Sequence, residues 1–262
     1  MTDAAPGQRG DPTPIFVGGL HRSGTTLLAD LIGAHPDVAP LRDTGAYHDE
    51  GQFLQDVMPT ASQCGGPGRF ARGARAHLTE ADVVDVDDER ARLLAAWSPY
   101  WDPTRAYVVE KSPPDLLRFR YLQTVFPGAW CIAVVRQPVA VAYGTQPWAK
   151  GDSVSRLLDH WLVAHERFEA DRPRIQRLLF VRYEDLVRDV PGTLATIDAA
   201  IGLSVHVPDI SVRTDTNDRY LRRWHHFRGP IPNPRVVEKV RFERRVERLG
   251  YGYRLDDAMP RP

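Results

Sequence analysis

The chain has 262 residues, and its 34 lysines and arginines balance its 34 aspartates and glutamates, so the formal net charge is zero. Such a chain lacks the overall basic field expected of a protein that binds nucleic acid or a membrane surface. The only two cysteines, Cys64 and Cys131, lie far apart without metal-ligand spacing, which argues against a disulfide framework and fits a reducing compartment.

The N-terminal segment is polar and rich in glycine, proline and aspartate. It has no apolar core of a signal peptide, and the sequence contains no long apolar stretch. We therefore expect residues 1–13 to form a disordered tail and residues 14–262 to form a single domain. We also expect a cytoplasmic protein without membrane or nucleic-acid partners.

The most informative motif follows a short apolar run that ends at Val17. Residues 18–26 read GGLHRSGTT, and apolar residues with helical spacing follow from Leu27 to Ile32. This pattern predicts a strand, a glycine-rich loop and a helix N-terminus, whose unpaired N–H groups favour an anion. The alternative is a strand-to-helix turn that binds no ligand.

This loop differs from the triphosphate-binding motif GxxxxGK[ST] at one position, because Thr25 stands where the lysine is expected. That lysine normally reaches the β- and γ-phosphates of a nucleoside triphosphate. Arg22 lies inside the loop instead. The loop therefore predicts a nucleotide with a short 5′ anionic group, and a variant P-loop kinase or NTPase is the alternative.

Further apolar runs are short, continuous and bounded by turn residues, as buried parallel strands are. They cover residues 106–110, 130–135 and 178–182. Helical spacing of apolar residues is found over residues 114–126, 153–170, 191–201 and 234–249. The alternation predicts a three-layer α/β fold of the P-loop type, with a central, mostly parallel sheet of four to five strands flanked by helices. The irregular segments are expected to be acceptor-side insertions, near residues 43–105 and 204–233.

Each later strand is followed by a polar side chain suited to ligand binding. Lys111 ends one strand, and a lysine at the carboxyl end of a parallel strand points into the crevice. Arg136 ends the next and offers a bidentate fork for phosphate. Tyr183 follows the third and could stack on a base, while Glu184 or Asp185 could cap the next helix. The alternatives are a solvated turn for Lys111 and a cap or ion pair at the sheet edge for Arg136.

Four segments, in this order, resemble the sulfotransferases that use 3′-phosphoadenosine 5′-phosphosulfate (PAPS). They read RSGTTLL at 22–28, EKSP at 110–113, VVRQP at 134–138 and RYEDL at 182–186. The resemblance spans residues 14–203 and is greatest to the tyrosylprotein and bacterial small-molecule branches. Any one segment is modestly specific, but the ordered set is strongly so.

The resemblance implies a role for each segment in holding the donor. The 5′-phosphosulfate would be bound by Arg22 and by the four residues after it, namely Ser23, Gly24, Thr25 and Thr26. Lys111 would stabilise or protonate the bridging oxygen, and Arg136 would bind the 3′-phosphate, with Tyr183 beside the base. Late in the chain, Arg228 resembles a further family contact to the 3′-phosphate.

Three residues compete for the role of general base. In the tyrosylprotein branch a Glu-Thr pair follows the loop, and Asp43-Thr44 falls at that spacing from Arg22. Asp43 is therefore the first candidate, Glu50 the second and His48 the third. For each of them the alternative is a solvated acidic loop.

The sequence departs from the family at one position of the 3′-phosphate segment. The family usually has a serine eight residues after its arginine, and this chain has Gly144 there. A glycine offers a backbone N–H but no hydroxyl. Tyr143 or Thr145 could substitute for the serine, or the phosphate could depend more on Arg136.

The resemblance implies an enzyme that transfers a sulfo group in line from PAPS to a hydroxyl or amine of a small-molecule acceptor, with an acidic general base. The product of the donor would be 3′-phosphoadenosine 5′-phosphate (PAP), and no metal is implied. A non-catalytic nucleotide-binding protein of the same fold is a further alternative. Four aromatic residues either line an acceptor pocket or belong to the core: Trp97, Tyr100, Trp101 and Trp148.

Overall fold

The structure is a computed structural model, which describes residues 12–226 and 245–251. Its centre is a five-stranded sheet in the order β2-β3-β1-β4-β5. The strands are β1 (Thr13–Gly19), β2 (Val38–Pro40), β3 (Tyr107–Lys111), β4 (Trp130–Val135) and β5 (Leu178–Arg182). All neighbouring pairs are parallel, so the carboxyl ends of all five strands lie along one edge.

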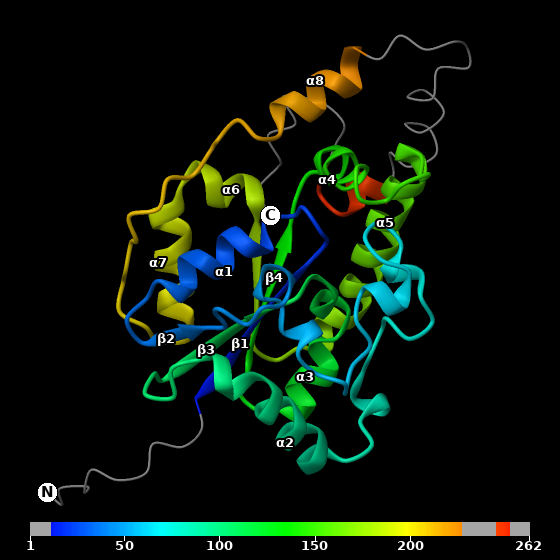
Figure 1. The fold of residues 1–262 in the computed structure, drawn as a ribbon. Helices are drawn as coiled ribbons and strands as arrows, with labels where there is room; N and C mark the ends of the chain where they lie inside the picture. The colour runs from blue at the N-terminus through cyan, green and yellow to red at the C-terminus, as the bar shows by residue number, and fades with distance from the viewer. Residues whose placement is uncertain (1–11, 227–244, 252–262) are drawn as a thin grey trace, which may run out of the picture.

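Helices cover both faces of this sheet (Figure 1). One face carries α1 (Thr25–Gly33), α6 (Tyr183–Arg188) and α7 (Val190–Ile201). The other carries α2 (Val86–Trp97), α3 (Phe119–Val125), α4 (Pro138–Thr145) and α5 (Val154–Asp171). The helix α8 (Asp218–His226) packs on α4. The predicted three-layer α/β fold is confirmed.

Alternate residues of each strand enter different cores, as the two-residue period of a strand requires. In β1, Ile15 and Val17 pack with α1 and α7, whereas Phe16 packs with Trp97 and Phe126 on the other side. All three strand residues are fully buried. Both faces are therefore apolar, which explains why these strands read as continuous apolar runs.

The structure differs from the sequence prediction in several elements. The helix predicted over 114–126 is divided into a 3₁₀ turn, Pro113–Leu117, and α3, because the backbone of Arg118 leaves the helical region at φ −135° and ψ 4°. Helices α2 and α8 lie inside the segments predicted to be irregular, and β2 has only three residues. Of the helix predicted over 234–249, residues 245–249 lie within the described part; residues 245–248 are helical and Leu249 is in a turn.

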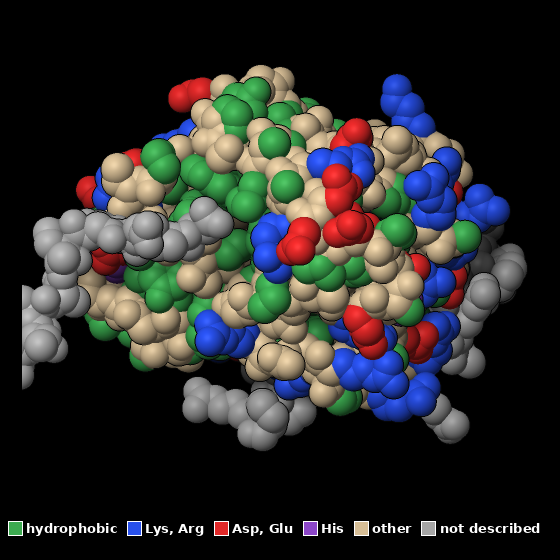
Figure 2. Space-filling model, turned by 90° about the horizontal axis from the view of Figure 1, so that it is seen from below, with side chains coloured by type: hydrophobic (Ala, Val, Ile, Leu, Met, Phe, Trp, Pro, Cys, Tyr) green, Lys and Arg blue, Asp and Glu red, His purple; other side chains and the backbone are tan. Residues whose placement is uncertain are grey.

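Charged side chains are interspersed on the surface. Figure 2 shows one face on which basic and acidic side chains lie next to one another. Ion pairs account for part of this pattern: Arg120 pairs with both Glu80 and Asp171, and Arg92 pairs with Asp56. Among the described residues, no helix combines the length and apolarity needed to cross a bilayer.

Two histidines of α5 are buried in the core. His160 Nε2 accepts the backbone N–H of Ala71 at 3.1 Å, and the His165 ring stacks on Trp161 with centroids 4.0 Å apart. Burial is the main cause that lowers the pKa of His160 from 6.5 to about 3 and the pKa of His165 to about 4. Both rings therefore stay neutral in the folded protein well below the pH at which they take up a proton in the unfolded chain.

We expect the free energy of unfolding to decrease as the pH falls below 6.5, the ordinary pKa of these histidines. Only the unfolded chain then binds the protons, so each histidine lowers stability by up to about 1.4 kcal/mol per pH unit. Urea unfolding at pH values from about 7 to about 5 measures this slope. His165→Phe is expected to reduce it, and a free energy that does not change in this window would contradict the assignment.

Candidate functional site

The glycine-rich loop connects β1 to α1 at the carboxyl edge of the sheet. Its last glycine, Gly24, is the N-cap of α1, and no side chain caps this helix. The first N–H groups of a helix have no partner within it and form an anion site with the helix dipole. Ser23 is fully buried beside them, and its hydroxyl has no hydrogen-bond partner among the described residues. Thr25 is buried, whereas Thr26 and Arg22 are exposed.

Gly24 is required at its position for two reasons. Its φ is 101°, in the region that favours glycine. A Cβ atom there would lie 2.4 Å from Cδ2 of Tyr183. The predicted base-stacking residue Tyr183 therefore contacts the predicted phosphate loop, and the structure brings these two segments together.

The buried ammonium of Lys111 lies beside the same loop. Lys111 pairs in register with Val17 on β1, and it shares its strand face with Val109, which packs on the α1 side. Its Nζ donates hydrogen bonds to Glu50 Oε1 at 3.1 Å and to the carbonyl oxygen of His48 at 3.2 Å. Lys111 is 6% exposed and Glu50 is 4% exposed. The structure thus joins Lys111 to Glu50, the second candidate for the base.

Burial raises the pKa of Glu50 above its usual range, and the positive charge of Lys111 partly opposes this rise. A carboxylate whose pKa is raised by burial is a stronger base than an exposed one, and a cationic partner favours its ionised form. Gln52 Nε2 donates to its second oxygen, Oε2. Glu50 is thus held in one orientation by two donors.

The first candidate, Asp43, lies in the segment that leads to Glu50. It is exposed, and no hydrogen bond or ion pair of its side chain is found within the described residues. Its neighbour Thr44 donates its N–H and its hydroxyl to Asp49 Oδ1, at 2.9 and 2.7 Å. Asp43, His48 and Asp49 all have positive φ angles of 49–54°, and such strain is common where a segment is held for function.

A second carboxylate, Glu110, fixes the segment that carries Glu50. It precedes Lys111 on β3 and therefore points to the opposite face of the sheet. Its Oε1 accepts the N–H of Gly51 at 2.9 Å and the hydroxyl of Ser112 at 2.6 Å. The Ser112 hydroxyl in turn accepts the N–H of Gln52 at 3.0 Å. Glu110 has no role among the predicted site residues, although its place directly before Lys111 in a buried strand indicates one.

The carboxyl group of Asp115 lies next to this network and is fully buried. Burial and, after it, the negative charge of Glu110 raise its pKa well above the usual range, while Arg118 opposes the rise. This shift favours the neutral, protonated form of Asp115.

We expect Glu110→Ala to destabilise the protein and to loosen the backbone segment next to Glu50, which the Glu110 network holds in place. The substitution leaves the Gly51 N–H and the Ser112 hydroxyl buried without their acceptor, at a cost of about 1–3 kcal/mol for each group. Glu110→Gln keeps an acceptor oxygen and should restore most of the stability. Urea unfolding of both variants measures the effect, and equal stability of Glu110→Ala and the parent protein would contradict the network.

Arg136 is buried at the end of β4 and binds three protein oxygens. Its Nε donates to Asn217 Oδ1 at 2.7 Å, its Nη1 to the carbonyl of Arg22 at 3.0 Å, and its Nη2 to Thr216 Oγ1 at 3.1 Å. Its guanidinium carbon lies 4.0 Å from the ring centroid of Tyr183. Arg136 thus contacts the loop through the carbonyl of Arg22. Its predicted role in binding the 3′-phosphate stays a prediction.

The remaining predicted residues have different positions. Trp97 and Trp101 belong to the core, Tyr100 is partly buried against it, and Trp148 is 41% exposed. Arg228, the late arginine predicted for the 3′-phosphate, lies outside the described residues.

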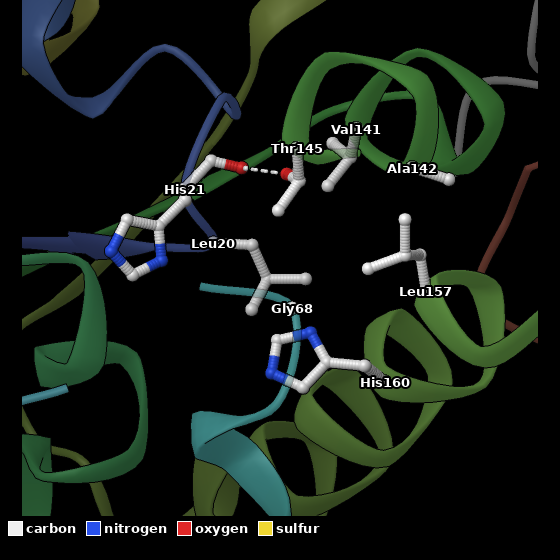
Figure 3. A pocket seen from close by; sticks show the side chains of 8 residues that line it. All are labelled: Leu20, His21, Gly68, Val141, Ala142, Thr145, Leu157 and His160. Atoms are coloured by element: carbon white, nitrogen blue, oxygen red, sulfur yellow. Dashed lines mark hydrogen bonds between the residues drawn. The ribbon is translucent and has the colours of Figure 1, made fainter. Parts of the chain in front are cut away.

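Side chains of the loop, α4 and α5 pack closely around a small pocket beside the loop (Figure 3). Leu20 and Leu157 point into it from opposite sides, and the Thr145 hydroxyl donates to the carbonyl of His21 at 3.3 Å. Its free volume is about 0 Å³. It therefore fixes the loop on α4 and α5 and leaves no room for a ligand. In the part of the chain that the structure describes, no group of three His, Cys, Asp or Glu side chains is placed to hold a metal ion.

The sequence matches the model of one protein family and resembles several known proteins. The model of the "Sulfotransferase family" matches residues 14–207. Protein-tyrosine sulfotransferase 1 of Danio rerio is 32% identical over 125 residues, which are 47% of this chain and 32% of that protein. Protein-tyrosine sulfotransferase 2 of Gallus gallus is 31% identical over 125 residues, 47% of this chain and 30% of that protein. The match therefore spans about a third of the length of these curated relatives.

Solved structures share the fold. The sulfotransferase domain of the Synechococcus olefin synthase has a TM-score of 0.53 and 17% identity, covering 92% of this chain and 98% of that chain. Sulfotransferase STF1 of Mycobacterium tuberculosis has a TM-score of 0.51 and 20% identity, covering 89% of this chain and 77% of that chain. At these identities the likeness concerns the fold alone.

Proposed function

The chain belongs to the sulfotransferase family, and from this membership we propose that it transfers a sulfo group from PAPS to a hydroxyl, or an amine, of a small-molecule acceptor. The observation that carries the proposal is the buried contact between Lys111 Nζ and Glu50 Oε1, 3.1 Å long, at the sheet edge where the loop ends. A cation and a base side by side are what transfer between two oxygens requires.

The residues around the loop fit the 5′ end of such a donor. The uncapped start of α1 and the buried Ser23 hydroxyl offer donors without a protein partner in the described chain. Arg22 adds an exposed positive charge. Thr25 in place of a lysine suits a short anionic group better than a triphosphate. PAPS would supply the sulfo group and leave as PAP.

Glu50 and Lys111 would have different roles in the transfer: Glu50 would take up a proton, and Lys111 would stabilise negative charge. Glu50 would accept the proton of the acceptor hydroxyl while the acceptor oxygen forms a bond to sulfur. Lys111 would donate a hydrogen bond to the bridging oxygen as the bond from that oxygen to sulfur breaks. The Lys111 ammonium lies within hydrogen-bond distance of Glu50, so both groups can act on the same in-line transfer.

The proposed acceptor class is supported by the surroundings of Glu50. The aromatic residues Tyr47 and Phe53 flank it in sequence and are 58% and 39% exposed, so ring surfaces are available to a phenol or another planar acceptor. Protein-tyrosine sulfotransferases are among the relatives, and a tyrosine side chain is itself a phenol. A cytoplasmic location stays part of the proposal and rests on the two free, buried cysteines and the balanced charge.

Calorimetric titration with PAP tests the donor. We expect saturable binding to one site, and weaker binding of adenosine 5′-phosphate, which lacks the 3′-phosphate. A folded protein that binds neither PAPS nor PAP would overturn the proposed function.

A further inference from the structure

Gln52 is a buried amide next to the proposed base. It is 1% exposed and lies in the short 3₁₀ turn Gly51–Phe53, which begins directly after Glu50. Its backbone N–H donates to Ser112 Oγ at 3.0 Å, and its carbonyl oxygen accepts from Gln55 Nε2 at 3.1 Å. The backbone of Gln52 is therefore anchored at both of its polar groups.

The orientation of the Gln52 amide is fixed by a backbone N–H on another segment. The N–H of Ala61 donates to Gln52 Oε1 at 2.7 Å. Because a backbone N–H can only donate, the amide oxygen has to face Ala61 and the amide NH₂ has to face Glu50. Gln52 Nε2 therefore donates to Glu50 Oε2. The reverse orientation would place the NH₂ against the Ala61 N–H and leave the carboxylate facing an oxygen.

The two oxygens of Glu50 consequently have different donors. Oε2 accepts from an amide whose other end is held by Ala61. Oε1 accepts from the Lys111 ammonium, whose Nζ also donates to the carbonyl oxygen of His48. An ammonium on a flexible stem can turn a donor toward another oxygen, whereas a buried amide fixed at both ends cannot. Oε1 is therefore the oxygen that can lose its donor during a reaction.

The charges that face Glu50 act in opposite directions. Burial raises its pKa, the positive charge of Lys111 and the hydrogen bonds from Lys111 and Gln52 lower it, and the negative charge of Glu110 raises it. Asp115 lies close enough for the charge of Glu50 to contribute to the rise of its own pKa. Among these carboxyl groups, the donors on Lys111 and Gln52 favour the ionised form of Glu50.

We propose that Gln52 is a positioning residue of the sulfo transfer: it keeps Oε2 of Glu50 hydrogen-bonded, so that Oε1 takes up the proton of the acceptor hydroxyl. As the acceptor oxygen forms its bond to sulfur, its proton moves to Oε1 and the bond from sulfur to the bridging oxygen breaks with its electron pair on that oxygen. Lys111 Nζ then donates to the bridging oxygen instead of Oε1. The inference rests on the proposed function for the reaction and adds which atom of Glu50 takes the proton.

Gln52→Glu tests this role, because it keeps the size of the side chain and an oxygen for the Ala61 N–H. It replaces the NH₂ by an oxygen that faces Glu50 Oε2. Two carboxyl groups in contact share a proton, so the acid limb of the rate profile should move to higher pH. The value of kcat near neutral pH should fall by about 10-fold to 100-fold, while KM for PAPS and calorimetric binding of PAP should not change.

Gln55→Glu is the matched control. It adds the same charge to the same turn, and the described hydrogen bonds of the Gln55 side chain are to backbone groups of Gln52 and Met58. A loss of these bonds lowers stability, but it leaves both donors of Glu50 in place. The control should therefore keep the kcat and the pH profile of the parent protein.

Gln52→Met provides a second variant, because it removes the donor without adding a charge. The acid limb should move in the same direction as in Gln52→Glu. A carboxyl ¹³C titration by NMR reads the ionisation of Glu50 without turnover, and the loss of the resonance in Glu50→Gln assigns it. This resonance should titrate at a higher pH in Gln52→Met than in the parent protein.

The outcomes separate the inference from the proposed function. A parent-like pH profile and ¹³C titration in the Gln52 variants, or the same change in Gln55→Glu, overturns the inference, while turnover by the parent protein leaves the proposed function intact. Gln52 variants that do not fold, beside a folded Gln55→Glu, assign Gln52 a purely structural role and also overturn it. If the parent protein transfers no sulfo group, the proposed function fails and the ¹³C titration alone decides whether Gln52 controls the ionisation of Glu50.

Discussion

Replacing Glu50 by glutamine is expected to lower kcat by about 10²-fold to 10⁴-fold, the usual contribution of a general base. Glutamine keeps the size of the side chain and can still accept the hydrogen bond from Lys111 Nζ, but it cannot take the acceptor proton. KM for PAPS should change little, because the proposed role of Glu50 is to contact the acceptor and not the donor. The measurement is the steady-state rate with PAPS and the best acceptor from a panel of phenols, alcohols and sugars.

The pH profile provides a second readout of the same variant. Because burial raises the pKa of Glu50, the rate of the parent protein should fall on the acid side at a pH above the ordinary pKa of a glutamate, as the base takes up a proton. Glu50→Gln should lose this dependence. Glu169→Gln, on α5 with a carboxylate paired to Arg172, is the matched control and should leave both rate and profile unchanged.

Asp43→Asn decides between the two acidic candidates. Asp43 is exposed, and within the described residues no hydrogen bond or ion pair joins it to Lys111. We therefore expect a smaller loss than for Glu50→Gln. If Asp43→Asn abolishes turnover and Glu50→Gln retains it, the base is Asp43 and the role given to Glu50 is wrong.

Replacing Lys111 by methionine is expected to reduce kcat by about 10²-fold to 10³-fold, similar to the loss of one charged donor from a preorganised site. Methionine keeps the apolar stem of the side chain but removes the charge that stabilises the departing oxygen. It also leaves Glu50 without its cationic partner at 3.1 Å, which raises the pKa of Glu50 further. The acid limb of the pH profile should therefore move to higher pH.

Lys150→Met is the matched control for this substitution. Lys150 is exposed, and its described contact is a backbone carbonyl that accepts from Arg69, so its side chain should not influence turnover. Equal activity of Lys111→Met and Lys150→Met would contradict the role of Lys111.

The sequence predicted the parts of the site that are local. The strand, the loop with Gly24 and the start of α1 follow one another directly, and Lys111 and Arg136 each end a continuous apolar strand. Because parallel strands place their carboxyl ends along one edge, these residues meet wherever the sheet forms. The five-stranded parallel sheet and its covering helices follow from the same pattern.

Contacts between residues that lie far apart in the sequence could not be predicted in this way. Glu50 reaches Lys111 across 61 positions, through a segment whose positive φ angles at His48 and Asp49 have no sequence signal beyond residue type. Spacing therefore favoured Asp43, whereas packing places Glu50 at the ammonium. Helix α8 was likewise not predicted, because it lies inside the segment expected to be irregular.

The most direct test of the proposed activity is incubation of the protein with PAPS and an acceptor panel, followed by mass spectrometry of the acceptors and of the nucleotide. We expect one acceptor to gain a single sulfo group while an equal amount of PAP appears, without added metal. Lys111→Met should lose this transfer. A protein that is folded and binds PAP, yet modifies no phenol, alcohol, sugar or amine and releases no PAP, would contradict it.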